Sequence, residues 1–147
     1  MAVTKILMRD VSWSINTGTP GSPVWVAIGG IDTATHTVTK NDQDSTDVNS
    51  AGRLEHMTVS RGDVFTLTGR RLEDYSGGAR DAGQAAVEAA AQLFGVNSIA
   101  RQLRGTSPGG HTMIALGSWK CTPWGGSHDD FASWEGEFTV TGAASWT

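Results

Sequence analysis

One stretch of the sequence, residues 81–94, has the pattern of an α-helix, whereas the rest of the chain has the pattern of strands and turns. Asp81 can accept a hydrogen bond from a free N–H of the first turn, Gln84 stands where a capping-box partner would be, and Gly95 can end the helix in a left-handed conformation. The apolar side chains at helical spacing are Ala82, Ala86, Val87, Ala89, Ala90, Leu93 and Phe94. Because this stripe consists mostly of methyl groups, we expect the helix to pack closely against the face of a sheet.

Size and composition are those of one globular domain. The chain has 147 residues, of which 38% are hydrophobic and 18% are charged, so it can bury a core without disulfides or metals. The one cysteine, Cys121, alternates with apolar neighbours and is expected to be a buried, inert thiol. Residues 1–13 contain no apolar run long enough for a signal peptide or a membrane span. The net charge of −4 argues against tight nucleic-acid binding, which needs clustered Lys and Arg.

Alternating apolar and polar residues predict strands in five stretches: 24–28, 55–68, 98–104, 111–122 and 134–141. The Arg-Gly-Asp sequence at 61–63 predicts a turn or bulge that divides the second stretch into two strands. Antiparallel strands with one helix on a face correspond to an α+β or mainly β fold with a β-sandwich-like arrangement. We expect one domain over residues 1–147. It would carry an N-terminal arm (1–23), which could include a first strand, and a C-terminal tail (142–147).

Residues 32–53 are rich in Thr, Ser and Asn and have no sustained apolar face. The charged residues of this segment are Asp32, Lys40, Asp42, Asp44, Asp47 and Arg53. A loop of this length inside a small domain is unusual and is often functional. Because it cannot bury itself, we expect the segment to be mobile or to be ordered by a partner.

The residues that could support catalysis or metal binding form no convincing site. His128, Asp129 and Asp130 are the densest cluster of possible ligands, but a metal site usually needs three or four converging side chains, and a hydrophilic turn explains the same cluster. Glu135 and Glu137 share one strand face, as a general acid and base would, yet polar-out alternation produces such pairs in many strands. We therefore expect no catalytic residue, no metal and no cofactor. A small hydrolase that uses the His–Asp or the carboxylate pair is kept as the least favoured alternative.

The six tryptophans fall into two groups. Those that alternate with polar neighbours and are expected in the core are Trp25, Trp119 and Trp134. Those that stand in the arm, a loop and the tail are Trp13, Trp124 and Trp146. Aromatic side chains in such positions are candidate anchors of an interface. An exposed tryptophan can also stack on a sugar ring, so a carbohydrate-binding or adhesion module is a second functional hypothesis.

A set of segments in a fixed order resembles one known family. The segments are 25–31 (WVAIGGI), 40–42 (KND), 51–52 (AG), 66–69 (TLTG), 78–88 (GARDAGQAAVE), 107–110 (SPGG) and 129–134 (DDFASW). Together they are similar to the major tail tube proteins of siphophages, the phages with long non-contractile tails, and in particular to those of phages of actinobacteria. The resemblance extends from about residue 25 to 142 and is carried by the ordered set of segments.

This resemblance implies a β-sandwich-like fold with one flanking helix, shared with the inner tubes of contractile tails and of type VI secretion systems. Such subunits assemble into hexameric rings that stack into a tube, and their sheets join into one continuous barrel around a channel. The tape measure protein fills this channel, DNA later passes through it without specific binding, and tail terminator and distal tail proteins are further partners. The resemblance thus implies a structural virion protein, assembled in the host cytoplasm, without catalytic residues, cofactor or membrane contact.

The resemblance also gives expected roles to two groups of residues. The segment 32–53 would reach a neighbouring subunit or ring. The interface candidates are the charged residues of this segment, Asp32, Lys40, Asp42, Asp44, Asp47 and Arg53, together with the three tryptophans proposed above as anchors, Trp13, Trp124 and Trp146.

The wall of a channel that passes DNA is expected to be polar and free of basic patches, because acidic side chains keep phosphates away from it. Glu135 and Glu137 are the candidates for this wall. The cations Arg101, Arg104 and Lys120 are expected to face outward or to pair with these glutamates across strands. Closing a ring also gives every exposed strand edge a partner.

Overall fold

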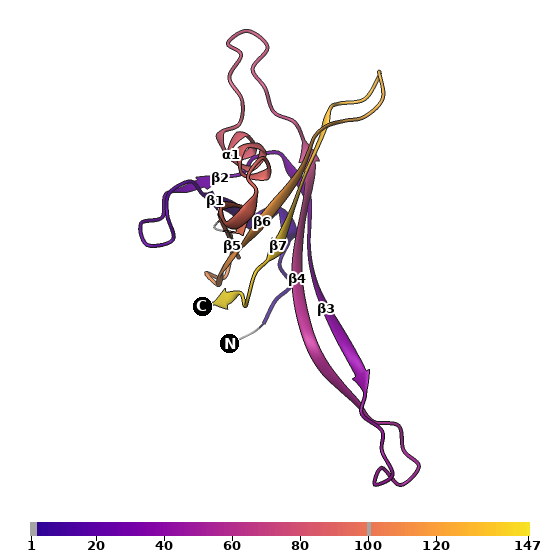
Figure 1. The fold of residues 1–147 in the computed structure, drawn as a ribbon. Coiled ribbons are helices and arrows are strands. Elements are labelled where there is room, and N and C mark those ends of the chain that lie inside the picture. Colours follow the sequence, from indigo (N-terminus) through magenta and orange to yellow (C-terminus); the bar gives the residue numbers. More distant parts are fainter. Residues whose placement is uncertain (1–2, 100) are drawn as a thin grey trace.

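One eight-stranded antiparallel sheet dominates the computed structural model, which describes residues 3–99 and 101–147 (Figure 1). The strands are β1 (Ser12–Asn16), β2 (Trp25–Ala27), β3 (Ile31–Asp44), β4 (His56–Arg70), β5 (Arg101–Thr106), β6 (Thr112–Gly125), β7 (Ser133–Val140) and β8 (Ser145–Trp146). Their order is β2-β1-β5-β6-β7-β4-β3, and β8 pairs with β6. The helices are α1 (Ala82–Ala91) and two short 3-10 helices, η1 (Met8–Asp10) and η2 (Gly95–Ile99). The predicted mainly β, antiparallel fold with one α-helix is confirmed for the described residues.

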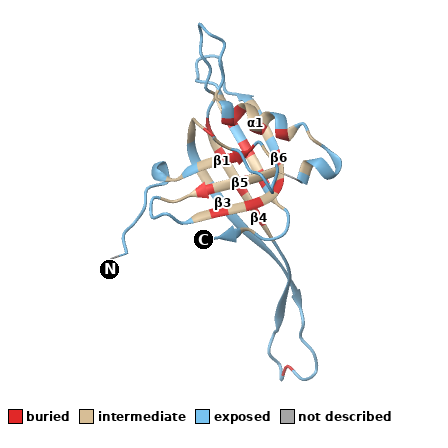
Figure 2. Ribbon diagram, turned by 90° about the vertical axis from the view of Figure 1, so that its left-hand side faces the viewer, coloured by how far each residue is buried: buried red, intermediate tan, exposed pale blue. Residues whose placement is uncertain are grey.

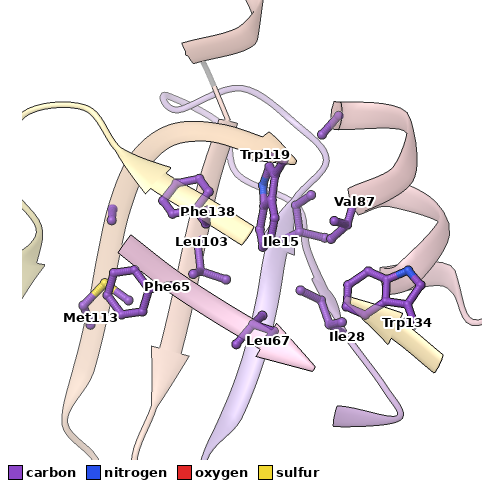
Figure 3. Packing of buried hydrophobic residues seen from close by; sticks show 12 residues of the cluster. Ile15, Ile28, Phe65, Leu67, Val87, Leu103, Met113, Trp119, Trp134 and Phe138 are labelled. Carbon is purple, nitrogen blue, oxygen red and sulfur yellow. The ribbon is translucent and has the colours of Figure 1, made fainter. Parts of the chain in front are cut away.

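The sheet curls so that its apolar face encloses the core. The largest fully buried apolar side chains are Ile15, Phe65, Leu67, Leu103, Trp134 and Phe138 (Figure 3). Trp13 of β1 meets Phe65 of β4 edge to face, with 5.9 Å between ring centroids, although three strands separate β1 from β4 in the sheet. The two halves of the sheet therefore face each other, which produces the sandwich-like arrangement. Each large side chain buried in this way contributes roughly 1.5–3 kcal/mol.

The alternation predicted for residues 111–122 and 134–141 is confirmed. The residues that β6 and β7 bury on the core face are Met113, Ala115, Gly117, Trp119, Trp134, Gly136 and Phe138. Trp25 was expected in this core, but it lies on the opposite face of β2, where the Cζ of Arg104 is 4.7 Å from its ring centroid. A strand of three residues alternates too briefly to show which of its faces is buried.

Helix α1 starts as predicted and ends earlier. The Asp81 side chain accepts the N–H of Gln84 at 3.0 Å, which confirms the predicted cap. The helix ends at Ala91 instead of residue 94, and Gly95, with φ +67°, begins η2. The residues that α1 buries are Gly83, Gln84, Val87 and Ala90. Three members of the predicted stripe are exposed instead, namely Ala82, Ala89 and Phe94.

Gly83 decides which face of α1 is buried. A Cβ atom at this position would overlap the backbone of Ala27 and Ile28, so the helix touches the end of β2 where it has no side chain. The closest approach is therefore made through a glycine and not through the alanine stripe. This rotates the buried face away from the one that the apolar pattern predicts.

Gln84 turns inward and does not act as a capping-box partner. Its side-chain amide donates hydrogen bonds to the carbonyl oxygens of Gly29 and Arg70, at 3.0 and 2.7 Å. Its side-chain oxygen accepts the N–H of Leu72 at 3.2 Å. Because all three partners are main-chain groups, this one buried side chain ties α1 to the chain after β2 and to the end of β4.

Residues 31–44, most of the segment expected to be a loop, form a strand. β3 pairs with β4 from Ile31 to Asp44, and only residues 45–55 form the connection (Figure 1). β4 runs through 61–63 without a break in its pairing, so the expected turn or bulge there is also wrong; the register shifts lie between Ile31 and Thr33 and between Asn41 and Asp42. Main-chain pairing and β-branched threonines hold this hairpin, and almost none of β3 is buried. A strand without a buried face has no apolar alternation, which is why the sequence pattern did not reveal it.

The segment expected to be an N-terminal arm contributes a strand inside the sheet. β1 lies between β2 and β5, and Ser14, Ile15 and Asn16 are buried there. At the other end of the chain, residues 145–146 of the expected tail form β8, in which Trp146 pairs with Met113. Residues 3–15 mix apolar and charged positions, and the tail is small and polar apart from Trp146, so neither region shows a sustained alternation.

Candidate assembly surfaces

The outer face of β3, β4, β7 and β6 carries mainly hydroxyl groups. The strand register places its side chains in three rows: Thr33, Thr68, Glu135, Thr122; Thr35, Thr66, Glu137, Lys120; and Thr37, Val64, Thr139, Ser118. They lie opposite the core because their sequence neighbours, such as Phe65 and Phe138, are buried. We call these twelve residues the polar face. Both lumen candidates, Glu135 and Glu137, lie on it.

The three cations with an expected role lie in different places. Lys120 is on the polar face, directly across from Glu137 in the register. Arg104 stacks on Trp25, and Arg101 lines a depression beside α1. In the described part of the chain, none of the three takes part in an ion pair. The expected pairing across strands is thus present only as the adjacency of Lys120 and Glu137.

Two unpaired strand edges border the polar face. The outer edge of β3 has no neighbouring strand among residues 3–99 and 101–147. On the other side, β5 pairs with β6 only as far as Gly117, so within the same residues β6 has no second partner strand over 118–125. A sheet edge of this length exposes a row of main-chain donors and acceptors.

The hairpin of β3 and β4 extends beyond the core. We call its residues 38–62 the arm, which is distinct from the N-terminal arm expected over residues 1–23. All of its residues up to 61, apart from Ser50, are exposed, as the pale blue projection in Figure 2 shows. Four of the charged interface candidates, Asp42, Asp44, Asp47 and Arg53, belong to the outer part of this arm. Asp32 lies at the other end of β3, 3.4 Å from the guanidinium of Arg70. The structure therefore distributes the candidates along the hairpin and does not gather them into one site.

Acidic side chains shape the tip of the arm, residues 45–55. The Asp44 carboxylate accepts the N–H of Thr46 at 2.8 Å, and its hydrogen bonds with Thr46 lower the pKa of Asp44. The Asp47 carboxylate accepts the N–H of Asn49 at 2.8 Å. These local bonds give the exposed tip a defined backbone without any core.

The three tryptophans proposed as anchors have different surroundings. Trp13 is half-buried against Phe65, so its ring belongs to the core and not to a free surface. Trp146 is exposed and lies 6.0 Å from His36, measured between ring centroids. Trp124 is 64% exposed, and one face of its ring is covered by the guanidinium of Arg71, whose Cζ is 3.8 Å from the ring centroid.

Arg71 is the most connected side chain at the end of the molecule opposite the arm. Its side chain is only 6% exposed and bonds the carboxylates of Glu73 and Glu88 at 2.5 and 2.7 Å. It also donates to the carbonyl oxygen of Pro123 at 3.1 Å, and Glu88 in turn contacts Arg80. Arg71 therefore joins the segment after β4, helix α1 and the end of β6.

A cleft of about 700 Å³ opens beside Arg71. Its aromatic and aliphatic lining consists of Leu72, Tyr75, Trp124 and Phe131. Tyr75 is fully exposed and Phe131 is 81% exposed, and the guanidinium of Arg70 lies over the Phe131 ring, with its Cζ 5.6 Å from the centroid. We call this feature the aromatic cleft.

The residues considered for chemistry do not converge. His128 and Asp129 contact each other at 3.2 Å on a loop where both are 98% exposed. No group of three or more His, Cys, Asp or Glu residues that could hold a metal occurs among the described residues. Cys121, which was expected to be buried, is only partly buried, and this partial burial raises the pKa of its thiol to about 11. Within the same residues, no helix is both long and apolar enough to cross a membrane.

Several solved structures share this architecture over nearly the whole chain. A chain in the tail of an empty gene transfer agent particle, refined with C6 symmetry, is 24% identical, with a TM-score of 0.64 over 96% of this chain and 98% of that chain. A chain in the virion of a native gene transfer agent particle is 22% identical, with a TM-score of 0.61 over 96% of this chain and 98% of that one. The chain shares the fold of these two gene transfer agent chains.

The same fold occurs in an extracellular contractile injection system. A chain of its sheath-tube complex in the extended state is 12% identical, with a TM-score of 0.58 over 97% of this chain and 91% of that chain. No family model matches the sequence, and no curated protein does. At these identities the likeness is one of fold.

The sequence patterns did not predict the aromatic cleft. The positions of the tryptophans indicated Trp124 but did not indicate Tyr75 or Phe131. The available signal was the presence of a single large aromatic residue in each of two polar loops, 71–80 and 126–132. The position of Arg71 between two carboxylates had no signal, because Glu73 and Glu88 approach it only in the folded chain.

Proposed function

We propose that this chain is the structural subunit of a tail tube, in which copies assemble into stacked hexameric rings around a channel for genome delivery. The observation that carries the proposal is the polar face of β3, β4, β7 and β6, bordered on both sides by unpaired strand edges. The fold shared with subunits of tail particles supports it. The role is one of assembly, without catalysis or cofactor.

In the proposed ring, the free edge of β3 in one copy pairs with residues 118–125 of β6 in the next. Main-chain hydrogen bonds across such a junction need no particular side chains, so the four strands of each copy extend into a continuous barrel. A head-to-tail contact of this kind closes into a ring, and a closed barrel leaves no edge unpaired.

The polar face would then form the channel wall. Its threonine and serine hydroxyls keep the wall hydrated, and Glu135 and Glu137 outnumber its one cation, Lys120. Negative charge on the wall repels the phosphates of a passing duplex, which lets DNA slide without specific binding.

We extend the proposal to the partners that such a tube requires. The arm, which includes most of the 32–53 candidates, would contact a neighbouring subunit or ring. A tape measure protein would occupy the channel before DNA does, terminator and distal tail proteins would contact the two ends of the tube, and assembly would take place in the host cytoplasm. The siphophage type, and phages of actinobacteria in particular, is the lineage that the sequence resemblance favours.

Electron microscopy and sedimentation velocity of the purified chain, over a range of concentrations, test this function. We expect six-fold rings and tubes that grow with concentration, because the strand edges associate by mass action. A chain that stays monomeric throughout and binds glycans would reject the tube and favour the carbohydrate-binding module. Loss of a measurable hydrolysis on replacing His128 or Asp129 would favour an enzyme.

A further inference from the structure

The aromatic cleft and the tip of the arm lie at opposite ends of the molecule. β4 connects them, because it begins at His56 beside the tip and ends at Arg70 beside the cleft. Figure 1 shows the tip at the lower end of the long hairpin and the loops that flank the cleft at the upper end. When copies of a chain stack in the same orientation, the tip end of one copy faces the cleft end of the next.

We propose that the aromatic cleft binds the arm tip, residues 45–55, of a second copy in the adjacent ring. This inference rests on the proposed tube function and specifies the contact that joins one ring to the next. It assigns a partner to the cleft and to the tip at the same time.

The exposed apolar side chains of the two surfaces match. On the tip, Val48 is 98% exposed and Leu54 is 79% exposed. On the cleft, Phe131 and Tyr75 present rings to solvent beside Leu72. Side chains of this size gathered at the ends of a molecule mark contact surfaces, and aromatic residues dominate the energy of such contacts.

The cleft lining has no net charge, because Arg70 and Arg71 are balanced by Glu73 and Asp130, but its one half-exposed cation can meet an acidic tip. The tip and the strand ends that flank it carry Asp44, Asp47 and Glu55 against one cation, Arg53. At the mouth of the cleft, the guanidinium of Arg70 is half-exposed and has only an exposed partner, Asp32. An acidic tip that approaches this guanidinium gains a charge-assisted contact at the rim of the apolar one.

The arm carries its tip well beyond the core of its own copy. Beyond the core, residues 39–44 of β3 pair with β4, and six residues of strand span roughly 20 Å. The tip therefore projects from its own copy on the side where the cleft end of a stacked copy would lie.

The cleft is formed before any partner arrives. Arg71 fixes the loop after β4 through Glu73, fixes α1 through Glu88 and fixes Trp124 by stacking. A pocket that is already rigid loses little conformational entropy when a partner enters it.

Cysteine cross-linking in assembled tubes tests the contact. The double variant Val48→Cys, Phe131→Cys is assembled and treated with a short bismaleimide, and the products are separated on a denaturing gel. We expect a ladder of covalent multimers that extends beyond six subunits, because each link joins successive rings. Two controls are expected to give no ladder: the parent chain, whose only thiol is Cys121, and Val48→Cys, Phe94→Cys, whose second site is equally exposed but lies at the end of α1.

The other possible outcomes contradict either the proposed contact or the tube function. Tubes that form without a ladder, or a control ladder of equal yield, overturn the proposed contact while the tube function stands. A ladder that stops at six subunits places the tip on a neighbour within the same ring and overturns the axial contact. A parent chain that never forms tubes rejects the tube function itself, and this inference with it.

If the double-cysteine chain does not assemble, charge variants test the same contact between the tip and the cleft. Val48→Asp and Phe131→Asp are expected to leave rings that fail to elongate, because a carboxylate enters an apolar contact. Phe94→Asp, with a side chain of similar exposure outside the contact, is expected to form tubes like the parent chain. Normal tube growth in Val48→Asp and Phe131→Asp overturns the proposal.

Discussion

At the scale of single residues, Arg71 shows how one buried cation organises an end of this molecule. Its guanidinium contacts two carboxylates, a carbonyl oxygen and the face of Trp124. Arginine suits this position because its planar group forms several hydrogen bonds in fixed directions and still stacks on an aromatic ring. Arg70, the preceding residue, is half-exposed over the Phe131 ring and has one ion-pair partner, the exposed Asp32.

Arg71→Ala is expected to lower the free energy of unfolding by about 2–4 kcal/mol, because it leaves the mostly buried Glu88 with one cation fewer. Urea denaturation followed by tryptophan fluorescence measures the change. Arg70→Ala is the matched control and should cost less than about 1 kcal/mol, since its ion pair is exposed. Equal effects of the two substitutions would show that the Arg71 network does not hold this end together.

Cys121 is expected to react slowly with alkylating agents until high pH. Burial raises its pKa from 9.0 to about 11, and this outweighs the nearby Arg71 and Arg80, which favour the thiolate. Since the thiolate is the reactive form, the alkylation rate of the native chain should reach half its maximum near pH 11, against about pH 9 in urea. Rapid alkylation of the native chain at pH 8 would contradict the burial of this thiol.

The same shift in pKa makes the stability of the folded chain decrease at high pH. Between about pH 9 and 11 the unfolded chain releases the thiol proton while the native chain retains it. The contribution of Cys121 to stability is therefore complete below pH 9 and decreases as the pH rises to 11. Cys121→Ser should remove this part of the pH dependence in urea titrations.

At the scale of secondary structure elements, α1 shows that contact geometry can override an apolar pattern. The alanine stripe fits the sheet face in composition, yet the helix is positioned by Gly83 against the backbone of β2 and by the bonds of Gln84. The helix joins the chain after β2 to the end of β4, so it braces two strands that are far apart in the sheet order.

Gly83→Ala tests this geometry, because propensity and packing predict opposite signs. Alanine stabilises an exposed helix interior by about 1 kcal/mol relative to glycine. Here the added Cβ meets the backbone of Ala27 and Ile28, so we expect a loss of about 1–3 kcal/mol in thermal or urea unfolding. Ala89→Gly, at an exposed position of the same helix, should follow propensity and lose about 1 kcal/mol. A stabilised Gly83→Ala variant would disprove the close contact.

The arm contributes no side chain to the hydrophobic core. The rest of the chain is therefore expected to fold without it. Replacing residues 41–60 with Asn-Gly connects β3 and β4 where Lys40 faces Arg61. Because almost all of the removed residues are exposed, the melting temperature should change by only a few degrees. Electron microscopy should show no tubes from this variant. Tubes of normal length would mean that the arm does not join subunits.

At the scale of the whole molecule, the sheet has two faces with different chemistry. The inner face encloses the core with tryptophan, phenylalanine and leucine, and the polar face presents hydroxyls and few charges. A curled sheet with free edges on both sides of the polar face can extend into a larger barrel without exposing its core. One sheet can thus stabilise the subunit with one face and form the proposed channel with the other.

Reversing the charge of the polar face is expected to make assembled tubes retain DNA. In the variant Glu135→Lys, Glu137→Lys, the glutamates of the proposed channel wall become cations that attract phosphates. Co-sedimentation of short duplex DNA with tubes at low salt should rise well above that of the parent tubes and fall as salt is added. Lys5→Glu, which lies outside the polar face, should leave DNA retention unchanged. Equal retention by parent and double variant would place these residues outside the channel.

The sequence predicted the strands that bury one face and missed those that bury none. β6 and β7 alternate with the core face where the pattern placed it, and Asp81 caps α1 as its position indicated. β3 has no apolar alternation because it is held by main-chain bonds to β4, and such bonds have no side-chain signature. For residues 3–15 the pattern left an arm and a first strand both open, because the five residues of β1 are too few to show a period.

What the sequence alone determined is therefore local: the alternation of β6 and β7, the start of the single predicted helix, and a composition suited to a polar surface. The tertiary structure decided which face of α1 is buried, that residues 31–44 form a strand of the hairpin that carries the arm, and that Arg71 and the aromatic cleft lie opposite the arm tip. Burial of one face of a strand or helix leaves a periodic pattern in neighbouring residues of the sequence. Strand pairing and the convergence of charged side chains depend instead on segments that are distant in the chain and meet only when it folds.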